Sequence, residues 1–155
     1  MRSRLFISLF GIALLASATS FGQADLSCDA KKLKGDIKGE LKPDYKYDSS
    51  KITRVIFKDK SQIKEVEVPL FIGEKYRFVF NTNSLPKPVE INIYNKKAGS
   101  SKRKLLYSSS KEKDTDNIFV WEPDKSRKMY INYKIPAGSA ADERGCVVFL
   151  LGYKL

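Results

Sequence analysis

From Thr53 onward, apolar side chains recur at every second position, and short segments rich in Gly, Pro and Asn interrupt the pattern. A period of two places side chains on one face of a β-strand. We expect eight strands, at 55–57, 63–70, 76–80, 89–94, 105–108, 118–121, 129–133 and 146–153. The last is a continuous apolar run, which predicts burial on both faces. Eight strands separated by turns are typical of a β-sandwich or jelly roll.

A short helix is expected before the strands, over residues 27–41. Apolar residues there recur at steps of three and four, on one helical face: Leu26, Ala30, Leu33, Ile37 and Leu41. Ser27 can cap the first turn, Asp29 suits the positive end of the helix, and Pro43 ends it. The sequence therefore predicts one mainly β domain with a leading helix.

Residues 1–23 have the order of a secretory signal peptide. Two arginines precede the apolar stretch 5–16, and small residues follow it. That stretch is shorter than the roughly 20 residues that span a bilayer. Cleavage after Gln23 is favoured, with Ala16-Ser17-Ala18 as the alternative. We expect an exported protein of a Gram-negative bacterium, periplasmic, surface-bound or released, whose domain 24–155 has no further membrane-spanning segment.

The chain has two cysteines, Cys28 and Cys146. An oxidising compartment favours one disulfide between them. The bond closes a loop of more than 100 residues, for which chain-entropy estimates give on the order of 4–5 kcal/mol. Two buried or intermolecular thiols are the alternative. Asp25 makes lipid attachment at Cys28 unfavourable, because that position normally holds an aliphatic residue.

Positive charge is unevenly distributed. The chain has 29 Lys and Arg against 18 Asp and Glu. Residues 31–64 hold 11 bases and 5 acids, and residues 96–113 hold 7 bases and 1 acid, so each segment carries +6. A solvated surface that maintains solubility is one interpretation, and capture of a polyanion is the other. The polyanion hypothesis assigns a site to Lys96, Lys97, Lys102, Arg103 and Lys104. Export favours envelope polysaccharide or an envelope protein as the partner over nucleic acid.

Histidine is absent from the chain, which removes Ser-His-Asp and Cys-His catalysis and every zinc site that needs His. We expect no catalytic residue, cofactor or metal. The segment 114–117 resembles part of a calcium loop, but calcium takes 6–8 oxygens, and a polar turn is favoured. A carboxylate-based hydrolase remains an alternative; its candidate acids are Glu65, Glu67, Glu90, Asp114, Asp116, Glu122, Asp124, Asp142 and Glu143.

Aromatic residues add a second hypothesis about binding. An outward Tyr or Trp beside lysines suits an acidic glycan, whereas at strand spacing most such rings pack in the core. The rings in question are Tyr45, Tyr47, Tyr94, Tyr107, Trp121, Tyr130 and Tyr133. Glu65 and Glu67 lie two apart on one strand, which predicts that both face solvent.

Three segments resemble bacterial pre-peptidase C-terminal β-sandwich domains. They are Phe71-Ile-Gly-Glu-Lys-Tyr-Arg-Phe, Val89-Glu-Ile-Asn-Ile-Tyr and Gly145-Cys-Val-Val-Phe-Leu-Leu-Gly-Tyr, and the similarity spans residues 62–154. It implies a small jelly roll with an accessory or binding role beside secreted enzymes. No site residues carry over, and the leading helix departs from the family pattern.

Together these features predict an exported, non-catalytic β-sandwich that binds an envelope component, either an acidic glycan or a partner protein. An accessory subunit of an envelope assembly is the alternative. The sequence leaves the oligomeric state open.

Overall fold

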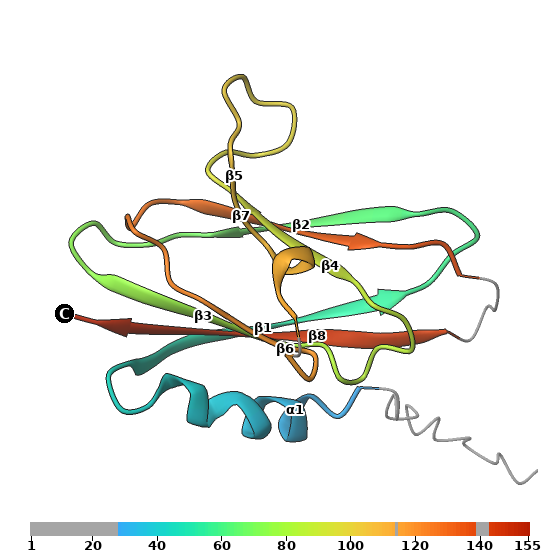
Figure 1. Cartoon of the computed structure of the whole chain (residues 1–155), viewed down its shortest axis with the longest axis horizontal. Coiled ribbons are helices and arrows are strands. Elements are labelled where there is room, and N and C mark those ends of the chain that lie inside the picture. Colours follow the sequence, from blue (N-terminus) through green and yellow to red (C-terminus); the bar gives the residue numbers. More distant parts are fainter. Residues whose placement is uncertain (1–27, 114, 139–142) are drawn as a thin grey trace, which may run out of the picture.

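The computed structural model describes residues 28–113, 115–138 and 143–155. The predicted signal peptide, Leu26 and Ser27 lie outside them. The fold is two antiparallel four-stranded sheets, with a helix under one (Figure 1). The elements are α1 (Ala30–Ile37), η1 (Lys38–Leu41), β1 (Lys46–Ile56), β2 (Gln62–Val68), β3 (Lys75–Asn81), β4 (Glu90–Tyr94), β5 (Leu105–Ser108), η2 (Ser109–Lys111), β6 (Ile118–Trp121), β7 (Met129–Ile135) and β8 (Arg144–Lys154). The predicted β-sandwich with a leading helix is confirmed.

The strand order is that of a jelly roll. One sheet runs β1-β8-β3-β6 and the other β2-β7-β4-β5. Strand β1 pairs with β8, β2 with β7, β3 with β6 and β4 with β5, each antiparallel. The chain is thus one long hairpin, folded so that its successive strand pairs alternate between two sheets. Its midpoint is the β4–β5 loop.

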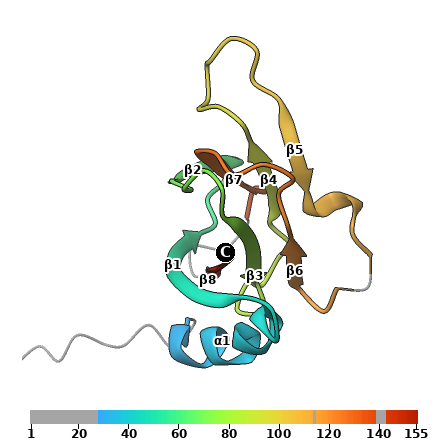
Figure 2. The same cartoon turned by 90° about the vertical axis from the view of Figure 1, so that its left-hand side faces the viewer.

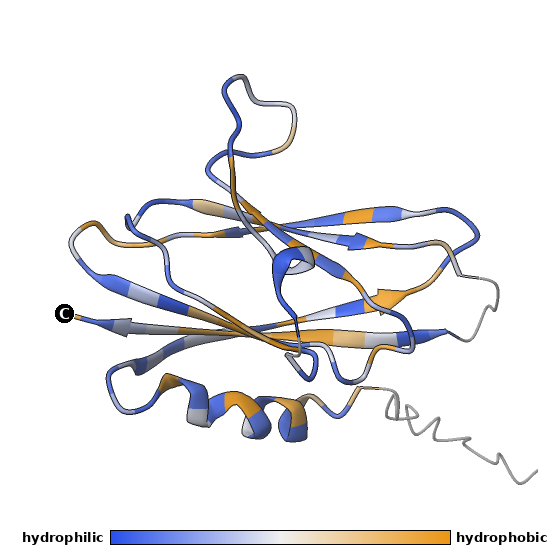
Figure 3. Cartoon of the chain, in the orientation of Figure 1, coloured by the Kyte–Doolittle hydropathy of each residue, from blue (hydrophilic) through white to orange (hydrophobic). Residues whose placement is uncertain are grey.

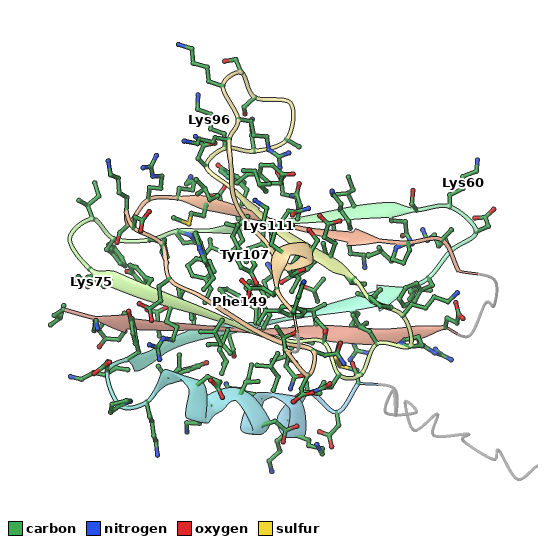
Figure 4. All side chains as sticks on the ribbon, viewed as in Figure 1. Lys60, Lys75, Lys96, Tyr107, Lys111 and Phe149 are labelled. Carbon is green, nitrogen blue, oxygen red and sulfur yellow. A yellow bond between two sulfur atoms is a disulfide. The ribbon has the colours of Figure 1, made fainter. Side chains whose placement is uncertain are left out.

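A core of aromatic and aliphatic side chains fills the space between the sheets. Phe149 of β8 stacks on Phe80 at 5.0 Å and contacts Phe78 at 5.3 Å between ring centroids. Ile131 and Tyr133 of β7 face them from the second sheet and are fully buried. Burying one such side chain contributes about 1.5–3 kcal/mol. Figure 4 shows Tyr107 and Phe149 between the two layers.

The second core lies on the outer face of the β1-β8-β3-β6 sheet, under α1. Leu33 and Ile37 of the helix pack on Val79 of β3 and on the even-numbered residues 146–150 of β8. The odd-numbered residues 147–151 point into the sandwich. Strand β8 is therefore buried on both faces, as its apolar run predicts (Figure 3). The molecule has three layers (Figure 2).

Local details differ from the sequence prediction in three places. Asp29, not Ser27, is the N-cap residue, and its carboxylate accepts a hydrogen bond from the Lys32 amide at 2.9 Å. Strand β1 begins at Lys46, nine residues before the strand predicted at 55–57, because the backbone of β8 pairs with it from Tyr153 to Arg144. The strand predicted at 63–70 ends at Val68 instead, and Ile63 near its start is 65% exposed on the outer face of β2.

The predicted disulfide between Cys28 and Cys146 is present. It spans 118 residues and joins the segment before α1 to the helix-facing side of β8. Within the described residues, no helix has the length and apolar character needed to cross a bilayer.

We expect the Cys28→Ala/Cys146→Ala variant to lose up to about 4–5 kcal/mol of unfolding free energy, because the unfolded chain regains the entropy of a very long loop. Urea unfolding followed by circular dichroism measures the loss. Equal stability of the variant and the parent, or two free thiols in the non-reduced parent by mass spectrometry, contradicts the expectation.

Two glycines give opposite predictions. A Cβ added at Gly35 of α1 contacts nothing within 4 Å, whereas one at Gly145 of β8 lies 2.3 Å from the Ser84 carbonyl oxygen. Gly35→Ala should stabilise the protein by about 0.4–1 kcal/mol, because it removes backbone freedom from the unfolded state. Gly145→Ala should destabilise it by more than this. Thermal unfolding of the two variants tests the pair, and the same sign of shift in both contradicts it.

Candidate functional site

The predicted basic segment forms the β4–β5 loop, residues 95–104, which projects away from the sandwich (Figure 1). The base of the loop is closed by Asn95: its amide donates to the Lys104 carbonyl at 3.1 Å, and its side-chain oxygen accepts from the Lys104 amide at 2.6 Å. Gly99 and Lys102 turn the chain with φ of 77° and 55°. The five predicted cations therefore sit on one loop, but they do not share one role.

Arg103 anchors the loop to the sheet. Its guanidinium donates to Glu65 at 2.9 Å and to the Asn132 side-chain oxygen at 2.6 Å, and lies 3.6 Å from the centre of the Tyr94 ring. The Glu65 carboxylate also accepts the Ala98 amide at 3.1 Å. The Arg103 charge is thus neutralised within the chain, and we leave Arg103 out of the polyanion site.

The other four cations point in different directions. Lys96 donates to the Ser101 carbonyl at 3.0 Å and stabilises the turn of the loop. Lys97 and Lys102 are exposed near its tip. Lys104, at the base, instead lines a cleft on the neighbouring side of the sandwich. The structure therefore separates Lys104 from the cations with which it clusters in the sequence.

This cleft lies where β5, at the edge of one sheet, meets β6, at the edge of the other (Figure 2). Its volume is about 300 Å³, and it is lined by Lys104, Trp121, Glu122, Asp124, Lys125 and Arg127 together with Leu106, Pro123 and Met129. Trp121 is partly buried: its ring packs on Phe78 and Tyr107, each 5.5 Å away between centroids. Packing on the core holds this ring in place and leaves part of it open to the cleft.

The cleft carries excess positive charge. Lys104, Lys125 and Arg127 are exposed, and none forms an ion pair with a carboxylate of the described residues. Of the two acids that line the cleft, Glu122 is neutralised by Arg77 at 2.6 Å. The negative charge of Asp124 therefore faces three positive charges, those of Lys104, Lys125 and Arg127. We call Lys104, Trp121, Lys125 and Arg127 the cationic cleft.

Glu122, directly after β6, is held ionised by Tyr45 and Arg77. Its Oε2 accepts the Tyr45 hydroxyl at 2.7 Å, and its Oε1 accepts Arg77 Nε at 2.7 Å. Burial acts to raise the pKa of Glu122, but the hydrogen bonds from Tyr45 and Arg77, together with the Arg77 charge, outweigh it and lower that pKa. Burial and the same carboxylate raise the pKa of Tyr45 to about 12. A carboxyl kept ionised is a poor proton donor, so Glu122 is not suited to general acid catalysis.

Four of the other acids considered for hydrolysis are also paired with cations. Glu65 and Glu67 face outward from β2, as predicted, and pair with Arg103 and Lys128. Glu90 pairs with Lys134, and Glu143 with Lys87. Asp116 has φ of 47° in a turn before β6; Asp114 and Asp142 are outside the described residues. In the described parts of the chain, no three His, Cys, Asp or Glu side chains gather as metal ligands do.

Sequence reasoning missed Lys125 and Arg127. They follow β6 in a segment that also holds Glu122 and Asp124, so its local charge gives no signal. Comparisons with protein-family models, curated proteins and solved structures found no match to this chain. The resemblance to pre-peptidase C-terminal domains therefore stays a prediction.

We expect Arg103→Ala to destabilise the protein by about 1–3 kcal/mol, because Glu65 and Asn132 lose a charged hydrogen-bond donor in a partly buried site. The Ala98 amide, which donates to Glu65, should then exchange with solvent faster in hydrogen-exchange experiments. Lys97→Ala on the same loop is the control and should stay within about 0.5 kcal/mol of the parent. Unchanged Ala98 exchange in Arg103→Ala would show that the anchor does not order the loop.

Proposed function

We propose that this protein is an exported, non-catalytic binding protein that holds an acidic glycan of the cell envelope in the cationic cleft. One observation carries the proposal: three exposed cations without carboxylate partners among the described residues surround a fixed aromatic ring in a cleft. A solvated surface needs no such convergence, since scattered lysines provide solubility equally well.

The chemistry of the cleft suits an acidic sugar. The Arg127 guanidinium can hold a carboxylate or a phosphate through two parallel hydrogen bonds, and the two lysines add point charges beside it. The open part of the Trp121 ring offers an apolar surface on which a sugar ring can lie. A volume of about 300 Å³ is at the lower end of small-ligand sites, which favours one or two sugar units over a long stretch of polymer.

Export and the absence of catalysis belong to the same proposal. The signal-peptide pattern of residues 1–23 supports export, and the Cys28–Cys146 disulfide is compatible with an oxidising compartment. The chain has no histidine, and three of the candidate acids, Glu122, Glu65 and Glu67, are paired with Arg77, Arg103 and Lys128. These contacts support binding over catalysis.

The experiment uses the chain's single tryptophan, Trp121, as an internal reporter. Titration of residues 24–155 with a polyuronate should change the Trp121 fluorescence and saturate, whereas neutral dextran should leave it unchanged. Affinity should fall as salt rises, because both the charged ligand and the cleft are screened.

Two variants with equal loss of charge locate the site. Lys104→Gln/Arg127→Gln should weaken polyuronate binding at least ten-fold. Lys58→Gln/Lys60→Gln, in the β1–β2 connection at the far end of the sandwich (Figure 4), should weaken it less than two-fold. Equal weakening by both pairs, or no binding by the parent at low ionic strength, rejects the cleft.

A further inference from the structure

The turn between β2 and β3 presents two adjacent apolar side chains to solvent. Phe71 is 74% exposed and Ile72 is 93% exposed. Both lie at one end of the sandwich, the end marked by Lys75 in Figure 4, beyond the last residue of β2. Contact between water and two large apolar side chains is unfavourable, so their position at the tip of a turn calls for a partner.

This exposure is built into the turn. The Phe71 amide donates to the Tyr76 hydroxyl at 3.1 Å, and this hydroxyl donates to Glu74 Oε2 at 2.6 Å. The Ser126 hydroxyl donates to the Glu74 carbonyl, which ties the turn to the β6–β7 loop. Gly73 has φ of +97°, which a side chain rarely adopts. Tyr76 is itself only 2% exposed, so the turn is anchored in the core and holds Phe71 and Ile72 outward.

Cations lie beside this turn. A groove of about 590 Å³ runs between the turn and the β6–β7 loop, and Ile72, Lys75, Lys125 and Arg127 line it together with the two acids Glu74 and Asp124. Lys154 of β8 lies opposite Lys75 in the β3–β8 register. No carboxylate of the described residues pairs with Lys75, Lys125 or Arg127. The tip is therefore apolar at its centre, and three cations against two carboxylates give its edge a net positive charge.

We propose that the β2–β3 turn inserts Phe71 and Ile72 into the surface of an anionic phospholipid bilayer. The apolar pair enters the boundary between headgroups and acyl chains, while the surrounding cations stay at the level of the lipid phosphates. Each Lys or Arg near an anionic surface strengthens the attraction to it. A stable protein–protein contact needs about 800 Å² on each partner, far more than two side chains supply. A bilayer needs only a rigid, narrow tip.

This inference is independent of the glycan proposal, although Lys125 and Arg127 line both the groove and the cationic cleft. Phe71 and Ile72 belong to the turn alone, and Lys104 belongs to the cleft alone. The two functions are therefore separable by substitution.

The test is co-sedimentation of residues 24–155 with vesicles of phosphatidylglycerol and phosphatidylcholine at 3:7, and with pure phosphatidylcholine vesicles. The parent should bind the anionic vesicles and bind the neutral ones at least ten-fold more weakly. Phe71→Ser/Ile72→Ser should reduce binding to anionic vesicles at least ten-fold. Lys75→Glu should also weaken it, and more so at low salt.

Ile56→Ser/Ile63→Ser is the matched control, since these residues are 52% and 65% exposed and lie away from the turn. It should bind vesicles within two-fold of the parent. The Phe71→Ser/Ile72→Ser variant should retain polyuronate binding by Trp121 fluorescence, which also shows that it is folded. Vesicle binding that is absent in the parent, or unaffected by Phe71→Ser/Ile72→Ser, overturns the proposal.

Discussion

The pairing of the first strand with the last is the constraint on which the rest of this fold depends. Residues 46–56 of β1 pair with 144–153 of β8, so nearly the whole chain lies between partners that must find each other. Strand β8 then needs apolar cover on both sides, from the opposite sheet and from α1. The disulfide between Cys28 and Cys146 holds the start of α1 against the outer face of β8. Contacts this distant in sequence are costly to form first, which is typical of slowly folding β proteins.

The alternation of apolar and polar residues made most of the strands predictable, and the strands or residues that depart from it do so for physical reasons. In β3 and β4 every second residue is apolar, because each strand sits within a sheet and has one face on the core. The first half of β1 has no such pattern, since residues 46–52 are all exposed, and it is a strand only because β8 supplies hydrogen-bond partners. Ile63 is apolar but faces outward, because it lies three residues before Val66 and a strand places such side chains on opposite faces.

The site was less predictable, because it depends on neighbours that are distant in the sequence. Charge counting found Lys104 but grouped it with Arg103, whose charge is cancelled by Glu65, 38 residues earlier. Residues 114–128 contain four acids and three bases, so charge counting gives no sign of a positive site at Lys125 and Arg127. The positive charge becomes evident only in the structure, where Arg77 and Tyr45 bind the Glu122 carboxylate. Trp121 was a candidate aromatic, and only the fold places it beside those cations.

The bond between Cys28 and Cys146 has a consequence for resistance to proteolysis. It turns the polypeptide between these residues into a closed covalent ring, and the β4–β5 loop is part of that ring. A protease that cuts the projecting loop once opens the ring without releasing a fragment. The two pieces stay joined through sulfur and through eight paired strands. The loop that projects from the sandwich is thus one whose scission leaves the molecule in one piece.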